Sequence, residues 1–197
     1  MIIRVPERRK QVAAIREDGE GVEGAAGRIA DMKKKLHHRV RMERPSRDLK
    51  KLPSILVGVS GEYFVAAELS RLGYVASVTL RNTRGIDILA ANADATRSVS
   101  IQVKTNHGKK KDWILNQKAE GIQSKTLFYV FVNLNGSNQR PDYHVVPSKV
   151  VAGYVTRTHQ EWREKPNRQG KPHGESDVRK FKDTANTYLD RWDLLGL

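Results

Sequence analysis

The fold is decided by residues 85–104, GIDILAANADATRSVSIQVK. Its two ends, 86–91 and 98–104, are rich in aliphatic and β-branched residues, which are typical of strands. Between them, residues 92–97 contain the Asn, Asp, Thr and Arg side chains of a turn. This order of two strand-like segments around a turn predicts a β-hairpin.

The hairpin separates apolar from polar side chains if Asp87 lies opposite Gln102. Side chains alternate along a strand, so each residue then has a definite face, and a slip of one residue would mix the two sets. The apolar face would consist of Ile86, Ile88, Ala90, Val99, Ile101 and Val103. The opposite face would present Asp87, Gln102 and Lys104, with Gly85 leaving space beside them.

The sequence around the hairpin predicts an α/β fold with a mixed sheet flanked by helices. A helix is expected at 60–72, with Phe64, Val65, Ala67, Leu69 and Leu72 as its apolar positions. Further strands are expected at 74–80, 127–134 and 143–146, with a variable link after the hairpin. Two helices should follow, capped by Ser148 and Ser176. Trp113, Trp162 and Trp192 are expected in the core.

These elements divide the chain into three parts. Residues 1–52 carry 15 basic and 8 acidic side chains, which predicts a flexible basic N-terminal arm. Residues 53–147 form the predicted α/β core, and residues 148–197 a helical extension packed on it.

The composition favours a polyanion as partner. Lys and Arg number 36 against 22 Asp and Glu, a formal charge of +14, and such an excess promotes binding to nucleic acid. The absence of cysteine excludes disulfides, Cys-ligated zinc and thiol nucleophiles. No apolar run is long enough to span a bilayer and no secretion signal is evident, so we expect a cytoplasmic protein without a membrane partner.

The polar face of the hairpin resembles the signature of the PD-(D/E)XK, or restriction-endonuclease-like, nuclease superfamily. Asp87 followed by Gln102-Val103-Lys104 is similar to its D…(D/E/Q)xK motif, in the QxK form known from Mrr-like restriction enzymes and transposon-end-cleaving subunits. The preceding Gly61-Glu62 helix, ending in Leu72-Gly73-Tyr74, looks like the first helix of the Holliday-junction-resolvase-like branch. The resemblance covers roughly residues 58–146 and implies an αβββαβ core.

The resemblance and the chemistry of phosphodiester hydrolysis imply the same site. Mg²⁺, for which Mn²⁺ can substitute, requires hard oxygen ligands. We expect Asp87 as the principal ligand, Glu62 as the second with Glu68 in reserve, and the Gln102 amide and Val103 carbonyl as further ligands. Lys104 would orient or deprotonate the attacking water or stabilise charge on the phosphate. Gln102 gives the site one formal negative charge fewer than an acid would.

Basic residues near the motif are candidate contacts to nucleic-acid phosphates. They are Arg81, Arg84, Lys109, Lys110 and Lys111. We therefore interpret the chain as a metal-dependent DNA endonuclease of resolvase or restriction type, acting in DNA repair, in restriction or defence, or on mobile elements. DNA is expected as the substrate rather than RNA, and the resemblance is compatible with a homodimer.

Two other functions stay open. The first is a nuclease-fold binding module whose catalytic site has decayed, which the Gln in place of an acid would favour. The second is a basic protein that binds RNA or the ribosome, which would use the charge but leave the hairpin pattern unexplained.

Overall fold

The computed structural model describes residues 52–80, 85–136 and 138–197, so nearly all of the predicted N-terminal arm lies outside the described residues. The elements in chain order are α2 (Ser54–Arg71), β1 (Val75–Val78), β2 (Ile88–Ala91), β3 (Ser98–Asn106), β4 (Asp112–Asn116), the 3-10 helix η2 (Gln117–Glu120), β5 (Leu127–Asn133), β6 (Asp142–Pro147), α3 (Ser148–Glu164), β7 (Val178–Lys182) and the 3-10 helix η3 (Trp192–Leu195). Within this part of the chain, no helix combines the length and apolar character needed to cross a membrane.

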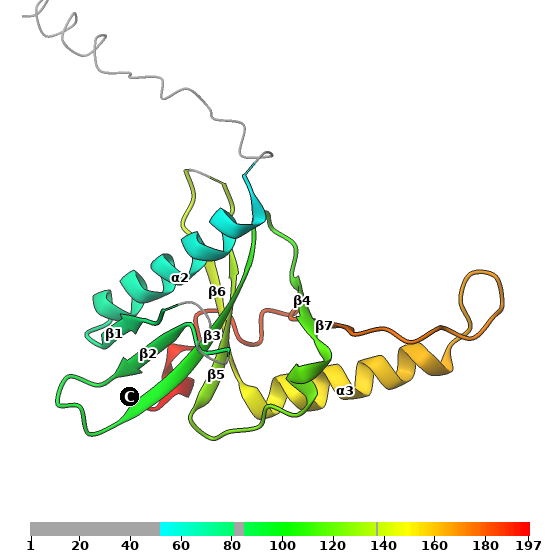
Figure 1. Cartoon of the computed structure of the whole chain (residues 1–197). Helices are drawn as coiled ribbons and strands as arrows, with labels where there is room; N and C mark the ends of the chain where they lie inside the picture. The colour runs from blue at the N-terminus through cyan, green and yellow to red at the C-terminus, as the bar shows by residue number, and fades with distance from the viewer. Residues whose placement is uncertain (1–51, 81–84, 137) are drawn as a thin grey trace, which may run out of the picture. The chain divides into compact units, whose positions relative to one another are not determined.

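The predicted α/β class is confirmed. A five-stranded mixed sheet has the strand order β1-β2-β3-β5-β6 (Figure 1). β1, β2 and β3 are antiparallel to one another, β3 is parallel to β5, and β5 is antiparallel to β6. Between β3 and β5, where the αβββαβ order expects a helix, the chain forms β4 and the short η2 instead. β4 pairs with β7 in a separate two-stranded sheet.

The hairpin pairs in the predicted register. Ile88 lies opposite Ile101 and Ala90 opposite Val99. These four side chains and Val103 are buried, so the predicted apolar face is a core face. The alternation of apolar and polar residues therefore determined the register, because any slip of one residue would have exposed this set.

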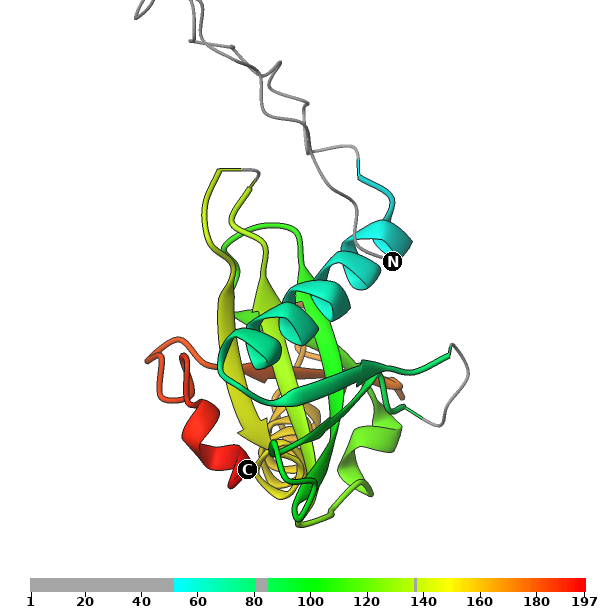
Figure 2. The same ribbon diagram turned by 90° about the vertical axis from the view of Figure 1, so that its left-hand side faces the viewer.

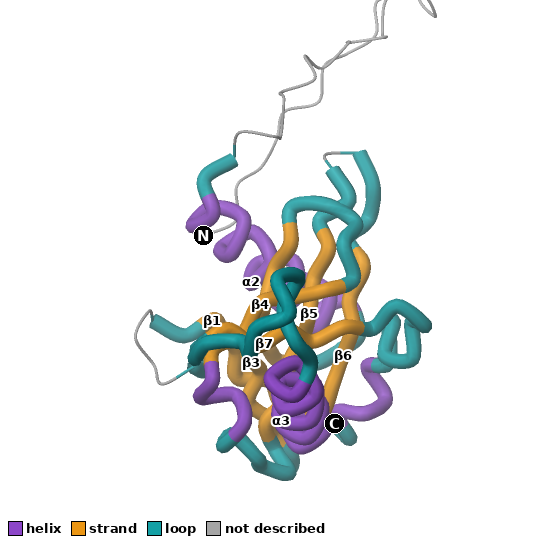
Figure 3. The backbone as a smooth tube through the Cα atoms, turned by 90° about the vertical axis from the view of Figure 1, so that its right-hand side faces the viewer, coloured by secondary structure: helices purple, strands orange, loops and turns teal. Residues whose placement is uncertain are grey.

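α2 covers the apolar face of the sheet. It lies in front of the sheet in Figure 2, whereas α3 lies in front in the opposite view of Figure 3. The core between α2 and the sheet includes Val65 and Leu69 from the helix, Ile101 from β3 and Val130 and Val132 from β5.

The predicted face of this helix is partly wrong. α2 begins at Ser54, six residues before the predicted start, and Val57, Gly61, Val65, Glu68 and Leu69 are its buried positions. Phe64 is 45% exposed and Leu72 38% exposed. The helix has apolar residues on nearly all sides, so its sequence alone does not reveal which stripe faces the sheet.

The second face of the sheet is covered over β5 and β6 and open over β1 and β2. The β4–β7 sheet and α3 bury Tyr129 and Phe131 of β5 together with Trp113 and Phe181. By contrast, Leu89 of β2, which points to the same side, is 50% exposed. β3 therefore runs along the boundary between a packed half and an open half of this face.

The predicted helix beginning at Ser176 is wrong. Residues 178–182 form β7, in which Arg179 and Phe181 are buried and their neighbours exposed. Arg179 is buried because it pairs with Glu120, and a charged residue at a buried position conceals the strand alternation. Beyond β7, Asp183 bonds to the buried His144 (Nδ1 to Oδ2, 2.7 Å) and accepts the backbone N–H groups of residues 187 and 188.

Two smaller expectations are also wrong. Ser148 does not cap α3; its hydroxyl donates to the Ser124 carbonyl at 2.9 Å and accepts the Ser124 N–H at 3.0 Å, which ties the preceding loop to the helix. Trp113 and Trp192 are core residues as expected, but Trp162 is 37% exposed.

α2 approaches β3 most closely at Gly61. A Cβ placed on Gly61 would lie 1.9 Å from Thr105 Oγ1, whereas a Cβ on Gly58 would meet nothing within 4 Å. We expect Gly61→Ala to lower the free energy of unfolding by about 1–3 kcal/mol because the helix must shift. The matched variant Gly58→Ala should raise it by up to about 1 kcal/mol through helix propensity. Urea denaturation measures both, and equal effects would contradict this account of the packing.

Candidate functional site

Asp87 lies where β2 separates from β3. The ladder between the strands ends at the pair Ile88–Ile101. Just before it, Asp87 Oδ2 accepts a hydrogen bond from the backbone N–H of Val103 at 2.7 Å. In a regular antiparallel ladder this N–H would reach the carbonyl of Ile86. The carboxylate thus replaces a backbone acceptor, and it lies close to the plane of the sheet.

Neighbouring strands hold the backbone around Asp87. The carbonyl of Ile86 accepts a hydrogen bond from Thr79 Oγ1 at 2.6 Å, and the carbonyl of Asp87 accepts one from the Thr79 N–H at 2.9 Å. On the other side, the Asp87 N–H donates to the Ile101 carbonyl at 2.9 Å. The carboxylate is therefore attached to a backbone that is bonded on both sides.

Gly85 makes room for Gln102 beside Asp87. Gly85 has φ of +75°, a conformation that glycine adopts without strain. A Cβ at this position would lie 3.3 Å from the Gln102 amide nitrogen. Gln102 directly precedes Val103, whose N–H binds the Asp87 carboxylate. That the Asp87 and Gln102 side chains act at one site stays a prediction.

Lys104 projects from the same face of β3 as Gln102. The buried residues Ile101 and Val103 alternate with Gln102 and Lys104, which are both partly exposed. Their parallel partners on β5 are Tyr129 and Phe131, which belong to the second core. Gln102 and Lys104 therefore lie at the boundary of the open half of this face, where a large ligand has access.

Glu62 does not share a face with these residues. It follows Gly61 on α2, which touches β3 at Thr105, one residue beyond Lys104. Gln102 and Lys104 project from the opposite side of the sheet, while the Asp87 carboxylate lies near the sheet plane. The role of Glu62 as a second metal ligand stays a prediction.

Glu68, the reserve ligand, belongs to an ion-pair cluster. Its carboxylate accepts two hydrogen bonds from Arg71, at 2.7 and 3.0 Å, and one from Arg140 at 2.7 Å. Arg71 and, despite burial, Arg140 hold the pKa of Glu68 below its usual value. The cluster joins α2 to the residues before β6, so Glu68 has a structural role.

The lysines after β3 lie in a loop with an anchored backbone. Asn106 Nδ2 donates to the carbonyls of Lys110 and Asp112, both at 2.9 Å. The side chains of Lys109 and Lys110 are exposed and that of Lys111 is partly exposed. This loop directly follows β3, the strand that carries Gln102 and Lys104. The three lysines are therefore close in sequence to the candidate site. Arg81 and Arg84 lie outside the described residues.

The site is poor in carboxylates. No group of three or more His, Asp or Glu side chains is placed to hold a metal ion within residues 52–80, 85–136 and 138–197. Among the described residues, a cation at Asp87 would therefore be held by amide, backbone or water oxygens in addition to this carboxylate.

Comparisons with known proteins give a distant likeness. No protein-family model matches the chain, and no curated protein matches it. Among solved structures, the chain is similar to a bacterial homing endonuclease, I-Ssp6803I, at 15% identity over 73% of this chain and 92% of that chain, with a TM-score of 0.44. A likeness of this degree does not identify the activity of this chain.

The sequence pattern did not reveal how Asp87 is held. Pairing of the strands predicted that Asp87 faces Gln102, but the bond to the Val103 N–H and the support from Thr79 require knowledge of where β1 lies. The position of α2 relative to Gln102 is likewise a tertiary property without a local signal.

The Asp87–Val103 bond can be tested by a pair of variants. Asp87→Ala leaves the N–H of Val103 without its acceptor and should lower the free energy of unfolding by about 1–3 kcal/mol. Asp87→Asn keeps a side-chain oxygen that can accept this bond, and its effect should be less than half as large. Urea denaturation at neutral pH compares them; equal destabilisation would show that the bond does not support the hairpin.

Proposed function

We propose that this chain is a Mg²⁺-dependent DNA endonuclease that hydrolyses phosphodiester bonds at Asp87, Gln102 and Lys104. The observation that carries the proposal is the bond between Asp87 Oδ2 and the Val103 N–H. It fixes a carboxylate against the backbone of β3, the strand from which Gln102 and Lys104 project. The membership of the PD-(D/E)XK superfamily implied by the motif is part of this proposal.

The oxygen donors of Asp87, Gln102 and Val103 fit Mg²⁺ or Mn²⁺. Because Asp87 Oδ2 binds a backbone N–H, Oδ1 is the oxygen that would hold the cation. The Gln102 side-chain oxygen and the Val103 carbonyl would be further ligands, with Glu62 approaching from α2. All are hard oxygen donors, as Mg²⁺ prefers. The cation would supply positive charge that stabilises the negative charge developing on the scissile phosphate.

Lys104 would act on the substrate directly. Its side chain projects from the same face of β3 as that of Gln102 and is partly exposed. From there it can donate hydrogen bonds to a phosphate oxygen or orient the attacking water.

The charge of the chain supports DNA as the substrate. The formal charge of +14 favours binding to phosphates. Lys109, Lys110 and Lys111, together with Arg81 and Arg84, would contact the backbone near the site. Such contacts give a preference for DNA structure more readily than for base sequence. A cytoplasmic role in DNA repair, restriction or defence, or mobile-element processing fits this chemistry.

The outer face of α2 supports a homodimer. Four large apolar side chains along it are exposed, although a helix that is apolar on all sides is ordinarily covered. They are Ile55, Leu56, Tyr63 and Phe64. A second copy packed on this helix would bury them.

A decayed binding module is the second candidate function. Two observations favour it: the amide at Gln102 and the position of Glu62 on the helix that covers the opposite face. Such a module would bind DNA through the same lysines without hydrolysing it.

Cleavage of plasmid, linear and branched DNA with Mg²⁺ or Mn²⁺ tests the proposal. Asp87→Asn and Lys104→Gln should each lower the cleavage rate by about a hundredfold or more, because each removes charge stabilisation at the phosphate. Ser100→Ala, a change on the same face of β3, should cleave as the wild type does. Metal-independent DNA binding without cleavage of any substrate would favour the binding module.

Gln102→Glu tests the metal ligands separately. An added formal charge beside Asp87 should lower the Mg²⁺ concentration needed for half-maximal cleavage by about tenfold, whereas Gln102→Ala should raise it. A titration of cleavage against Mg²⁺ measures both. An unchanged metal dependence in both variants would show that Gln102 is not a ligand.

A further inference from the structure

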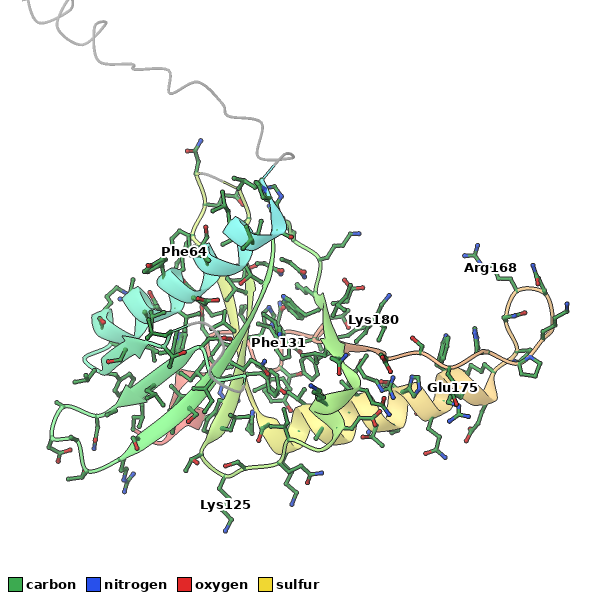
Figure 4. All side chains as sticks on the ribbon, in the orientation of Figure 1. Phe64, Lys125, Phe131, Arg168, Glu175 and Lys180 are labelled. Atoms are coloured by element: carbon green, nitrogen blue, oxygen red, sulfur yellow. The ribbon has the colours of Figure 1, made fainter. Side chains whose placement is uncertain are left out.

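A cleft separates α3 from β7, away from the hairpin that carries Asp87. α3 extends beyond the sheet, and the following segment returns beside it to reach β7 (Figure 1). The cleft has a volume of about 520 Å³, and its lining includes Tyr154, His159 and Trp162 from α3 and Lys180 and Lys182 from β7. Lys180 projects from β7 next to α3 (Figure 4).

The α3 side of the cleft is aromatic. The indole of Trp162 is 37% exposed, while Trp113 and Trp192 are 1% and 7% exposed. His173 stacks on this indole with ring centroids 4.0 Å apart, and His159 lies 5.3 Å away on the helix. His173 does not line the cleft, whereas Trp162 does and keeps part of its surface exposed.

The His159 imidazole adds an uncharged ring. Burial, followed by the charge of Arg179, lowers the pKa of His159. This shift favours the uncharged imidazole, whose ring stacks beside the Trp162 indole. Tyr154 is also held firmly, since its ring packs against Phe181 with centroids 4.9 Å apart.

The β7 side of the cleft carries positive charge that the rest of the described chain does not neutralise. Lys180 and Lys182 alternate along β7 and are both exposed. Within residues 52–80, 85–136 and 138–197 neither takes part in an ion pair, whereas Glu161, in the cleft wall, has Arg157 as its partner at 3.7 Å. Residues 148–182 contain nine basic and four acidic side chains, a net charge of +5.

The aromatic stack alone could serve only to attach the segment 165–177 to α3. That role explains His173, but it leaves unexplained why the lining of one cleft contains both these rings and two unneutralised lysines. Rings beside cations are the arrangement with which proteins bind single-stranded nucleic acid, because bases stack and phosphates pair with lysine.

We infer that the α3–β7 cleft binds an unpaired nucleotide segment, with bases against Trp162 and His159 and phosphates against Lys180 and Lys182. The volume lies within the range of roughly 300–1,000 Å³ that suits small ligands, and it admits one or two nucleotides but no duplex. As a preference for DNA substrates with an unpaired strand or flap, the inference rests on the proposed endonuclease function. Binding in the cleft itself does not depend on cleavage.

Tryptophan fluorescence of the full chain with an oligothymidylate single strand tests the inference. Because Trp162 is the exposed tryptophan, bound bases should quench its emission. Trp162→Phe should lose this quenching but bind labelled oligonucleotide within about threefold of wild type in fluorescence anisotropy. Trp162→Leu, which removes the stacking ring, should weaken binding about tenfold.

The lysines are tested by salt dependence. The double variant Lys180→Gln/Lys182→Gln should reduce the slope of log affinity against log salt by about 1.4, or 0.7 for each phosphate contact to a single strand. The matched control Lys149→Gln, an exposed change at the start of α3 outside the cleft, should keep the slope of wild type.

Three outcomes would overturn the inference. The first is oligonucleotide binding that neither Trp162→Leu nor the double lysine variant weakens. The second is quenching of Trp162 by duplex DNA as strong as that by single strands. The third is displacement of the oligonucleotide by polyglutamate at a lower concentration of charged groups than competing single strands require, which would indicate an acidic peptide as the ligand. Asp87→Asn keeps the two proposals distinguishable. It should lower cleavage by about a hundredfold or more and preserve the quenching of Trp162. Loss of quenching alone would refute the binding cleft, and unchanged cleavage alone would refute the endonuclease site.

Discussion

The hydrogen bond from the Val103 N–H to the Asp87 carboxylate ends the β2–β3 ladder and keeps a charged group at its end. Without it, a backbone N–H of the central strand would lack a partner, or β2 would continue and close the gap. With it, β2 and β3 separate beside the positions from which the Gln102 and Lys104 side chains project. Thr79, the residue after β1, donates to the Ile86 carbonyl, so the segment after β1 and strand β3 both bond to the segment that carries this carboxylate.

The two faces of the five-stranded sheet are covered differently. α2 packs on the apolar face, and at Gly61 it approaches β3 so closely that a methyl group would not fit. The other face is divided: α3 and the β4–β7 sheet cover β5 and β6, while the surface over β1 and β2 is open. Gln102 and Lys104 lie at the boundary of the open half, and the cleft beside α3 is a separate surface with exposed lysines.

Local patterning accounts for what the sequence predicted well. The hairpin register over residues 88–101 and the α/β class follow from side-chain alternation around one turn. β7 was predicted as a helix because Arg179 occupies a buried position through its pairing with Glu120, a partner about sixty residues away. Tertiary packing determines which face of α2 is buried and how far Trp162 is exposed. It also determines on which side of the sheet Glu62 lies. No pattern within a single element encodes them.

The central claim is that the gap at Asp87 holds a divalent cation for phosphodiester hydrolysis. A crystal structure of the protein with Mn²⁺, analysed through the anomalous scattering of the metal, tests it most directly. The account predicts a Mn²⁺ peak within coordination distance of Asp87 Oδ1 and the Val103 carbonyl, which disappears in Asp87→Asn. A structure without a peak at Asp87 at millimolar Mn²⁺, or with the metal held only by other residues, would contradict it.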